Sequence, residues 1–305
     1  MLVLAFLDNC VTLIITDFSG TILSNLFVHL GHSNGKNELD ENTLRHMVLN
    51  TLRSYEKKYG SDYGEMVIAM DSRAGYWRKQ VFPYYKASRK TSLEASPLDW
   101  ENIFVSLNKI REELKTYFSW RIIDVEGAEA DDVIGVLTRR FGTDLVMGFG
   151  QKILILSSDK DFIQLHHYGN VRQFSPLKKK YISHPSPVAY LREHIIRGDV
   201  GDGVPNFMSP DDCLVVKSRQ TPVSTKKLLE WVKHPQPPET LNNDRLLRGW
   251  KRNQQLIDLT FTPKHIEEAI NKQYDAQEGK KSGDLFSYFM EHRMKEMMSE
   301  IHDFA

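Results

Sequence analysis

Cysteine is nearly absent from this chain of 305 residues, which contains only Cys10 and Cys213. These two cysteines show no metal-ligand spacing, and nothing in the sequence suggests export to a compartment where disulfides form. We therefore expect two reduced thiols and a cytoplasmic protein. Long apolar runs are also missing, and none approaches the ~20 residues of a membrane span. The N-terminal stretch MLVLAFLDNC is apolar, but it is short, lacks a basic start and contains Asp8, so it is a poor signal peptide.

An excess of either charge is missing as well, since 40 Lys and Arg residues balance 40 Asp and Glu residues. A sum of zero argues at first against a polyanionic partner such as nucleic acid. The 41% hydrophobic and 26% charged residues are typical of an ordinary globular protein, and the length suits one large domain or two unequal ones. The position of the charges is therefore more informative than their sum.

Apolar runs that end in polar residues predict four strands. They lie within 10–20, 65–73, 120–127 and 152–161. Helical periodicity marks three segments between or after them, at 41–59, 99–118 and 129–141. Apolar strands that alternate with helices indicate the α/β class, with a mostly parallel sheet and helices on both faces. In such a sheet, ligands bind outside the carboxyl ends of the strands.

After about residue 185 the remaining periodic segments all read as helices, and no convincing strand follows. The segment HPSP (184–187) contains two prolines and interrupts the pattern. We therefore expect an α/β domain over residues 1–185 and a smaller all-helical domain over residues 186–305.

Acidic residues follow every predicted strand. They are Asp17, Asp71, Glu129, Asp131, Asp132, Asp159 and Asp161, and the glycine-rich turn RGDVGDGVPN (197–206) adds Asp199 and Asp202. Acids in a first helical turn also complement the helix dipole, which is the structural alternative for those in EADD. Because parallel strands end at one edge of a sheet, however, acids at all four exits would repel one another unless a cation lay between them.

Ligands that offer only oxygen, without a cluster of His or Cys, favour Mg²⁺ or Mn²⁺. The number of carboxylates exceeds what one ion needs and predicts two ions, as in enzymes that cleave phosphodiesters. Eleven histidines are present, but none falls in these motifs, so we do not expect a mechanism based on histidine. Setting the nine acids aside leaves 31 acidic residues against 40 basic ones, a balance that suits a polyanion.

The segment GYWRKQVFPYYKASRK (75–90) interleaves basic and aromatic residues directly after Asp71. Aromatic rings stack on bases while cations bind phosphates, so this composition favours contact with a single strand of nucleic acid. The alternative is a solvated basic helix with a few aromatic residues in the core. The segments KKKY (178–181) and RLLRGWKR (245–252) are weaker basic patches that we expect to be solvated.

In their order and spacing, IITDFSG, MDSRAGYWRK, PYYKASR, EADD, SSDKDF and GDVGDGVPN resemble the flap endonuclease family of 5′-nucleases over nearly the whole chain. The resemblance implies a PIN-like domain, a helical arch at about 75–98 and a helix–three-turn–helix that begins at GDVGDGVPN. Most members continue with a GIGxKTA-like segment, whereas this chain has FMSPDDCLVVKSRQTPVSTKK. That departure leaves the second hairpin and its potassium site open.

The resemblance also implies roles for individual residues. Two Mg²⁺ ions would be bound, or Mn²⁺ in their place. The ligands of the first ion would be Asp17, Asp71, Asp131 and Asp159, and those of the second, partly through water, would be Asp161, Asp199 and Asp202. Glu129 and Asp132 would orient these ligands. Lys86 would touch the scissile phosphate, with Tyr85 and Arg89 nearby. The residues implied in nucleic-acid binding are Arg78, Lys79, Lys86, Arg89, Lys90, Gly201 and Gly203.

The activity implied is that of a monomeric, metal-dependent 5′-to-3′ exonuclease or flap endonuclease. Its substrates would be RNA–DNA hybrid, duplex and flapped DNA, and it would remove RNA primers from lagging-strand fragments. The partners implied are a single-stranded DNA-binding protein and a sliding clamp, for which the apolar residues 1–9 are a candidate segment. A PIN-type ribonuclease for single-stranded RNA and a non-catalytic, structure-specific DNA-binding protein are the alternatives. The sequence does not rank exonuclease against flap-endonuclease activity, or RNA against DNA.

Overall fold

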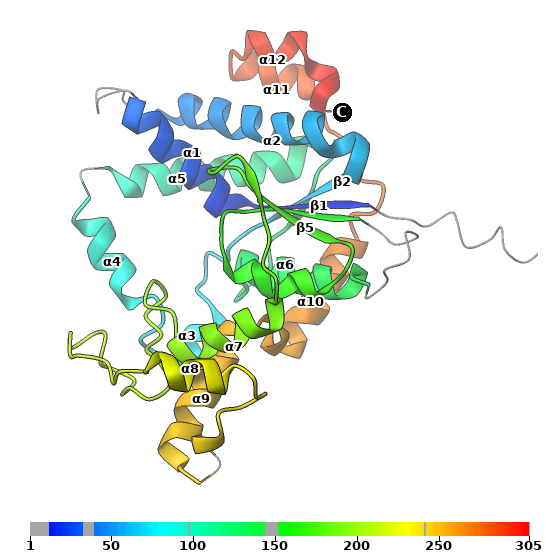
Figure 1. Cartoon of the computed structure of the whole chain (residues 1–305). Coiled ribbons are helices and arrows are strands. Elements are labelled where there is room, and N and C mark those ends of the chain that lie inside the picture. The colour runs from blue at the N-terminus through cyan, green and yellow to red at the C-terminus, as the bar shows by residue number, and fades with distance from the viewer. Residues whose placement is uncertain (1–11, 33–39, 97, 144–151, 241, 305) are drawn as a thin grey trace, which may run out of the picture.

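One six-stranded sheet, with strand order β3-β2-β1-β4-β5-β6, lies at the centre of this computed structural model (Figure 1). The structure describes residues 12–32, 40–96, 98–143, 152–240 and 242–304. The strands are β1 (Leu13–Asp17), β2 (Glu65–Ala69), β3 (Arg121–Ile123), β4 (Ile153–Leu156), β5 (Val171–Ser175) and β6 (Lys180–Ile182). The first five are parallel, and β6 pairs antiparallel with β5. The mostly parallel sheet and its first four strands are confirmed, whereas β5 and β6 were not expected.

Helices account for most of the remaining chain. The α-helices are α1 (Phe18–His32), α2 (Glu41–Tyr63), α3 (Trp77–Val81), α4 (Ala87–Glu94), α5 (Trp100–Tyr117), α6 (Ala130–Phe141), α7 (Pro187–Arg197), α8 (Thr225–Trp231), α9 (Asp244–Ile257), α10 (Lys264–Asp275), α11 (Leu285–Glu291) and α12 (Lys295–Ser299). The 3₁₀ helices are η2 (Asp161–His167), η3 (Pro238–Thr240), η4 (Leu259–Phe261) and η5 (Ile301–Phe304). The three helices expected between the strands correspond to α2, α5 and α6.

The two faces of the sheet pack against different helices, because successive side chains of a strand point to opposite faces. On β1, Ile14 packs with residues of α1, α2 and α5, while Leu13 and Ile15 pack with residues of α6 and α10. Figure 1 shows these two layers of helices above and below the strands. Both faces are covered, as expected for a parallel sheet whose strands are apolar throughout.

The edge strand β3 is completed by side chains instead of another strand. Gln277, just after α10, accepts from the Ile122 amide at 2.9 Å and donates to the Ile122 carbonyl at 2.9 Å. Gln273, on α10, accepts from the Asp124 amide at 2.6 Å and donates to its carbonyl at 3.2 Å. The two amides therefore take the place of a neighbouring strand along this edge.

The C-terminal helices fall into two packing groups. Helices α7, α8 and α9 form a third apolar cluster with Phe82 and Tyr85, and this cluster lies away from the sheet. In contrast, α10 packs on the sheet through Ile266 and Ile270, and α11 packs on its other side through Phe289. Of the region 186–305 that we expected to form a separate domain, only the part up to about Ile257 packs independently of the sheet.

The helix–three-turn–helix begins as expected but continues differently. Helix α7 leads into the glycine-rich turn, where the Val204 amide donates to the Asp199 carbonyl at 2.7 Å. The chain then runs through turns, and the next regular helix is α8, which begins at Thr225. The irregular part coincides with the segment in which the sequence departs from the family pattern.

None of the described helices combines the length and the hydropathy that a membrane crossing requires. Cys213 is a buried free thiol. Cys10 and the candidate clamp-binding residues 1–9 lie outside the described residues.

Candidate active site

The carboxyl end of β1 presents Asp17, which is 7% exposed. Its carboxylate accepts from the Gly20 amide at 2.9 Å and from the Ser157 hydroxyl at 2.8 Å, so it is tied to the ends of both β1 and β4. A Cβ on Gly20 would lie 2.3 Å from the Asp17 carboxylate, so a larger residue there would displace that carboxylate. Burial, together with the charge of Asp71, raises the pKa of Asp17 to about 6.

The acids that follow β2, β3 and β4 lie at the same edge. Asp71 accepts from the Ala130 amide at 3.1 Å, which links the end of β2 to the start of α6. Burial raises the pKa of Asp131 well above its usual value, and the charges of Asp159 and Asp17 add to the increase, while Lys86 opposes it. The four acids expected at the first metal site are therefore close enough to act on one another electrostatically, but among the described residues they do not form a group whose ligand atoms all lie within 4.8 Å.

A second group joins Asp161, His194 and Asp199. The His194 Nδ1 lies 3.4 Å from Asp161 Oδ1, and its Nε2 lies 3.3 Å from Asp199 Oδ2. One potential ligand atom from each of these three residues lies within 4.8 Å of the other two, and among the described residues this is the group that meets that criterion. Burial, with the charge of Asp159, raises the pKa of Asp161 to about 7, and the hydrogen bond from His194 lowers the pKa of Asp199.

His194 was missed by the sequence interpretation, which placed no histidine in the acidic motifs. Burial lowers the pKa of its imidazole, but the hydrogen bond with Asp199 and the charge of Asp161 outweigh burial, and the net shift is upward. The only available signal was position, because His194 lies on α7 one turn before the turn that carries Asp199.

Asp132 is held in a buried hydrogen-bond network, which is compatible with the orienting role implied for it and leaves no place for it as a metal ligand. It is fully buried, and it accepts from both terminal nitrogens of Arg78, at 2.9 and 3.0 Å. The Trp77 indole, the Thr262 hydroxyl and the Glu129 amide complete its contacts, at 3.1, 3.0 and 2.9 Å. No oxygen of this carboxylate is left for an ion.

Arg78 is buried, which leaves it no exposed surface for the contact with nucleic acid that we expected. Its side chain is 2% exposed, and the guanidinium pairs with Asp132 and with Glu129 at 2.8 Å. Its Nε donates to the Leu256 carbonyl at 2.9 Å, which joins the arch segment to the end of α9. Although Arg78 lies in a segment rich in lysine and arginine, it is the buried counterion of two acids.

Lys86 stands at the start of α4 with a positive φ of 55°, in the left-handed region. Its amide donates to the Asp202 carbonyl at 2.7 Å, and its Nζ bonds to Glu129 and lies 3.5 Å from Asp202. Burial lowers the pKa of Lys86, but the charges of Asp202 and Glu129 more than compensate and hold the amine protonated. A buried cation therefore stands beside the acidic edge.

Two other residues expected near Lys86 lie there. Tyr85 is buried, and its hydroxyl donates to Asp202 at 2.9 Å and contacts Glu129 at 3.0 Å. Burial and the charge of Asp202 raise the pKa of Tyr85 well above 10. Arg89 pairs with Asp202 at 2.6 Å while 56% of its side chain remains exposed. Glu129 thus positions Lys86 and Tyr85 and presents no free oxygen here.

The aromatic residues of the arch segment are mostly core residues and not a stacking surface. Trp77, Phe82 and Tyr85 are at most 4% exposed. This outcome matches the alternative interpretation of that segment, except that its cations are not all solvated. Lys79 is exposed, whereas the side chain of Lys90 lies outside the described residues.

The two glycines expected to bind nucleic acid differ. Gly201 is exposed, but Gly203 is buried, with a φ of 75°. A Cβ on Gly203 would lie 2.8 Å from the Tyr84 carbonyl, so glycine allows the turn to pack against the arch. Gly203 therefore has a packing role, and our expectation of direct contact with nucleic acid is corrected.

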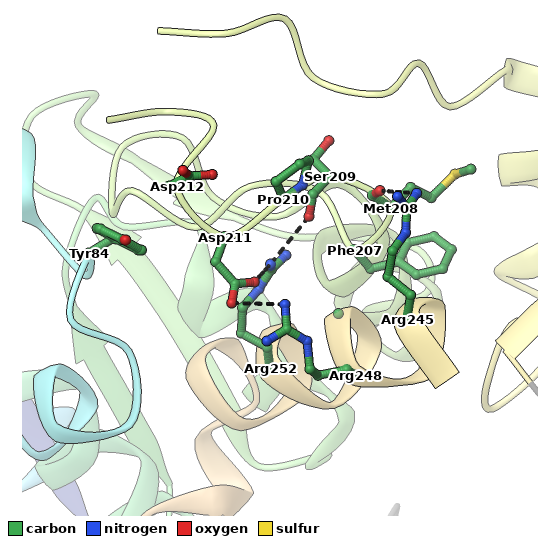
Figure 2. Close-up of a pocket in the computed structure, with 11 residues that line it drawn as sticks. Tyr84, Phe207, Met208, Ser209, Pro210, Asp211, Asp212, Arg245, Arg248 and Arg252 are labelled. Carbon is green, nitrogen blue, oxygen red and sulfur yellow. Dashed lines mark hydrogen bonds and ion pairs between the residues drawn. The ribbon is translucent and has the colours of Figure 1, made fainter. Parts of the chain in front are cut away.

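A basic cavity of about 320 Å³ lies next to the arch, between Tyr84 and α9. Figure 2 shows Asp211 beside Arg248 and Arg252, with Arg245 apart from them next to Met208. Asp211 pairs with the buried Arg252 and, at 3.1 Å, with Arg248, which remains 69% exposed. The basic patch at 245–252 is therefore partly built into the fold, and the exposed Arg245 and Arg248 add positive charge beside the arch.

The residues at the acidic edge fit divalent cations. Burial and mutual repulsion raise the pKa values of Asp17, Asp131 and Asp161, and a bound cation would relieve both causes. The donors at the expected first site, and those of Asp161 and Asp199, are carboxylate oxygens, the ligand type that Mg²⁺ and Mn²⁺ take.

Known families match nearly the whole chain. A family described as 5′-3′ exonuclease, N-terminal resolvase-like domain, matches residues 13–190, and one described as T4 RNase H, C terminal, matches residues 186–304. The chain is 32% identical to the ribonuclease H of Enterobacteria phage T4 over 295 residues, which are 94% of each protein. It is 34% identical over 155 residues to the flap endonuclease Xni of Shewanella woodyi, covering 50% of this chain and 54% of that relative.

Two solved structures share the fold. A bacteriophage T5 protein co-crystallised with metal ions gives a TM-score of 0.56, and the bacteriophage T5 flap endonuclease in a pseudo-enzyme–product complex with DNA and metal ions gives 0.58. Each is 16% identical and aligns with 87% of this chain and 99% of its own length. The expected fold class is thereby confirmed.

Proposed function

The chain belongs to the 5′-3′ exonuclease family, and we propose that it hydrolyses phosphodiesters from 5′ ends in flapped DNA, duplex DNA and RNA–DNA hybrid. The observation that carries this proposal is the gathering of Asp17, Asp71, Asp131 and Asp159 at one edge of the sheet, beside the buried amine of Lys86. Such an arrangement suits a reaction in which negative charge develops on a phosphate.

The metal ligands that we propose are the four acids of the first site together with Asp161, Asp199 and Asp202 at a second. When bound, the divalent ions would supply a hydroxide from water and stabilise the charge on the phosphate during in-line displacement. Hydrogen bonds from Gly20, Ser157 and Ala130 orient Asp17 and Asp71, two of the carboxylates that would hold the ions.

Lys86 would donate to the scissile phosphate, and its positive charge would stabilise the negative charge that develops there. Glu129 and Asp202 hold the amine in place, and Tyr85 supports both acids. Arg89 is exposed enough to reach the backbone of the substrate strand. Lys79, Lys90 and Gly201 would contact the nucleic acid further out, and Arg245 and Arg248 would do so on the side of α9.

The substrate in the cell would be the RNA primer at the 5′ end of a lagging-strand fragment, removed in the cytoplasm during DNA replication. The likeness to the ribonuclease H of phage T4 supports this role. We propose that the protein acts as a monomer, in contact with a single-stranded DNA-binding protein and a sliding clamp. The division of the chain near residue 185 is part of this proposal, and the boundaries of the two family matches support it.

A cleavage assay tests the proposal. A 5′-flap duplex, an RNA–DNA hybrid and a single-stranded RNA, each labelled at either end, are incubated with Mg²⁺ or with excess EDTA. We expect cleavage of the flap and the hybrid from their 5′ ends, only with the metal, and little cleavage of the single-stranded RNA. Full cleavage in EDTA, or degradation of the hybrid from its 3′ end, would overturn the proposal.

A further inference from the structure

Arg252, on α9, is a buried cation that the proposed reaction does not use. Its side chain is 7% exposed, and its guanidinium faces backbone oxygens of the loop 205–211, which follows the glycine-rich turn. The guanidinium donates to the carbonyls of Pro205 at 2.9 Å and Asn206 at 3.1 Å, and it lies 3.5 Å from the Ser209 carbonyl. A planar guanidinium with five donors can hold several fixed acceptors at once, which an ammonium cannot.

The same guanidinium joins the loop 205–211 to other parts of the protein. Its Nε donates to the side chain of Asn253 at 2.9 Å, and Asn253 in turn donates to the Ile195 carbonyl, on α7, at 2.8 Å. The Arg252 Cζ lies 5.6 Å from the centre of the Phe82 ring, in the arch segment. Arg252 therefore connects the loop with α7, α9 and the arch segment.

The loop ends at Asp211, whose carboxylate is shared between two arginines. Figure 2 shows Arg252 reaching both Asp211 and Ser209. The other carboxylate oxygen lies 3.1 Å from Arg248, which is 69% exposed and lines the cavity. Because the buried Arg252 already compensates the charge of Asp211, Arg248 can exchange this contact for a phosphate at little cost.

We infer that Arg252 is a positioning residue for substrate binding: its guanidinium fixes the loop 205–211, so that the loop and Arg248 are presented to the phosphate backbone of the duplex. The loop lies between two parts of the candidate site, since it follows the acidic glycine-rich turn and lines a cavity with Tyr84 of the arch segment. Contacts with phosphates set the register of a protein on a duplex. The inference rests on the proposed function, because it concerns how that same site binds its substrate.

A competing role for Arg252 is structural alone, as a buried ion pair that stabilises the fold. Loss of such a residue reduces the fraction of folded enzyme, which lowers the apparent kcat and leaves KM unchanged. Loss of a positioning residue for binding raises KM and leaves kcat nearly unchanged. The two roles are therefore separated by steady-state kinetics.

Cleavage of a labelled 5′-flap duplex by the full chain, with Mg²⁺ and a series of substrate concentrations, tests the inference. The variants are Arg252→Ala and Arg252→Lys, either of which suffices if the other does not fold. Lys251→Ala is the matched control, because Lys251 is the exposed neighbour on α9 with the same charge. The series is repeated at several salt concentrations. For Arg252→Ala it is also repeated with guanidinium, well below denaturing concentrations, against NaCl at equal ionic strength.

We expect KM to rise at least about tenfold in Arg252→Ala while kcat stays within about threefold of the parent. The slope of log(kcat/KM) against log salt concentration should become shallower by about one, the contribution of one phosphate contact. Arg252→Lys should lie between the parent and Arg252→Ala, because an ammonium reaches Asp211 but does not span the carbonyls. Guanidinium, and not NaCl, should lower the KM of Arg252→Ala, and Lys251→Ala should match the parent.

A KM equal to that of the parent in the Arg252 variants, or a loss confined to kcat, would overturn the inference and leave Arg252 a structural residue, while the proposed nuclease function would stand. An equal rise of KM in Lys251→Ala would also overturn it, because the effect would then follow from positive charge alone. A parent protein that does not cleave the flap duplex would instead overturn the proposed function together with this inference.

Discussion

Replacing Arg78 by methionine should destabilise the protein strongly, although the residue lies in a segment that reads as a basic surface. The guanidinium is 2% exposed and forms charged hydrogen bonds with Asp132 and Glu129. Methionine fills a similar volume but leaves the buried Asp132 without its counterion and leaves Glu129 with Lys86 alone. Breaking a buried pair in this way typically costs about 3–5 kcal/mol, out of a total stability of about 5–15 kcal/mol.

Urea unfolding measures this cost. With a slope of about 3 kcal/mol/M, the midpoint for Arg78→Met should fall by roughly 1–1.7 M. Lys79→Met is the matched control, because Lys79 is the exposed neighbour on α3, and its effect should stay within about 0.5 kcal/mol. The double variant Arg78→Met, Asp132→Asn removes one stranded charge and should recover more than half of the loss. A midpoint for Arg78→Met equal to that of Lys79→Met, or no recovery in the double variant, would refute the reasoning.

Three further predictions concern the acidic edge. Lys86→Ala should lower the single-turnover cleavage rate by ~10²–10³-fold while the affinity for DNA stays within about tenfold of the parent, because the amine acts where negative charge develops. A cleavage rate near that of the parent would show that Lys86 does not act on the phosphate. Asp131→Asn should lower the rate by at least about a hundredfold with similarly retained binding, and unchanged cleavage would mean that Asp131 is not a central ligand. Asp17 has a pKa of about 6 in the folded protein, above its ordinary 3.8, so its stabilising effect is present below about pH 4 and is lost as the pH rises through 6. Asp17→Asn, measured in EDTA, should therefore match the parent at pH 4 and exceed its stability at pH 7 by up to about 3 kcal/mol; a variant less stable than the parent at pH 7 would contradict this.

The acidic edge could be predicted from sequence because it depends on local patterns. Each apolar run fixes a strand, parallel pairing fixes which ends meet, and Asp17, Asp71 and Asp159 stand directly after those runs. Strands β5 and β6 escaped prediction because they are short and rich in polar residues, such as Gln173, which is buried by its neighbours and not by its own hydrophobicity.

The roles that sequence did not predict depend on distant partners. Asp131 and Asp132 are adjacent, and only the arrival of Arg78 and Thr262 decides which of them is buried as an ion-pair partner. His194 becomes a candidate ligand only when α7 packs next to η2, and no spacing along the chain encodes that contact. The return of α10 and α11 to the sheet is hidden for the same reason, since amphipathic helices do not specify which surface they cover.

The closure of β3 by two glutamines has a consequence for where the chain can be divided. A truncated protein that ends before α10 would keep every acid of the candidate site but would lose Gln273 and Gln277. The amides and carbonyls of Ile122 and Asp124 would then be open to pairing with another chain, as at any uncovered edge strand. Such a fragment should self-associate through β3, because the helical end of the protein covers the backbone groups along this edge.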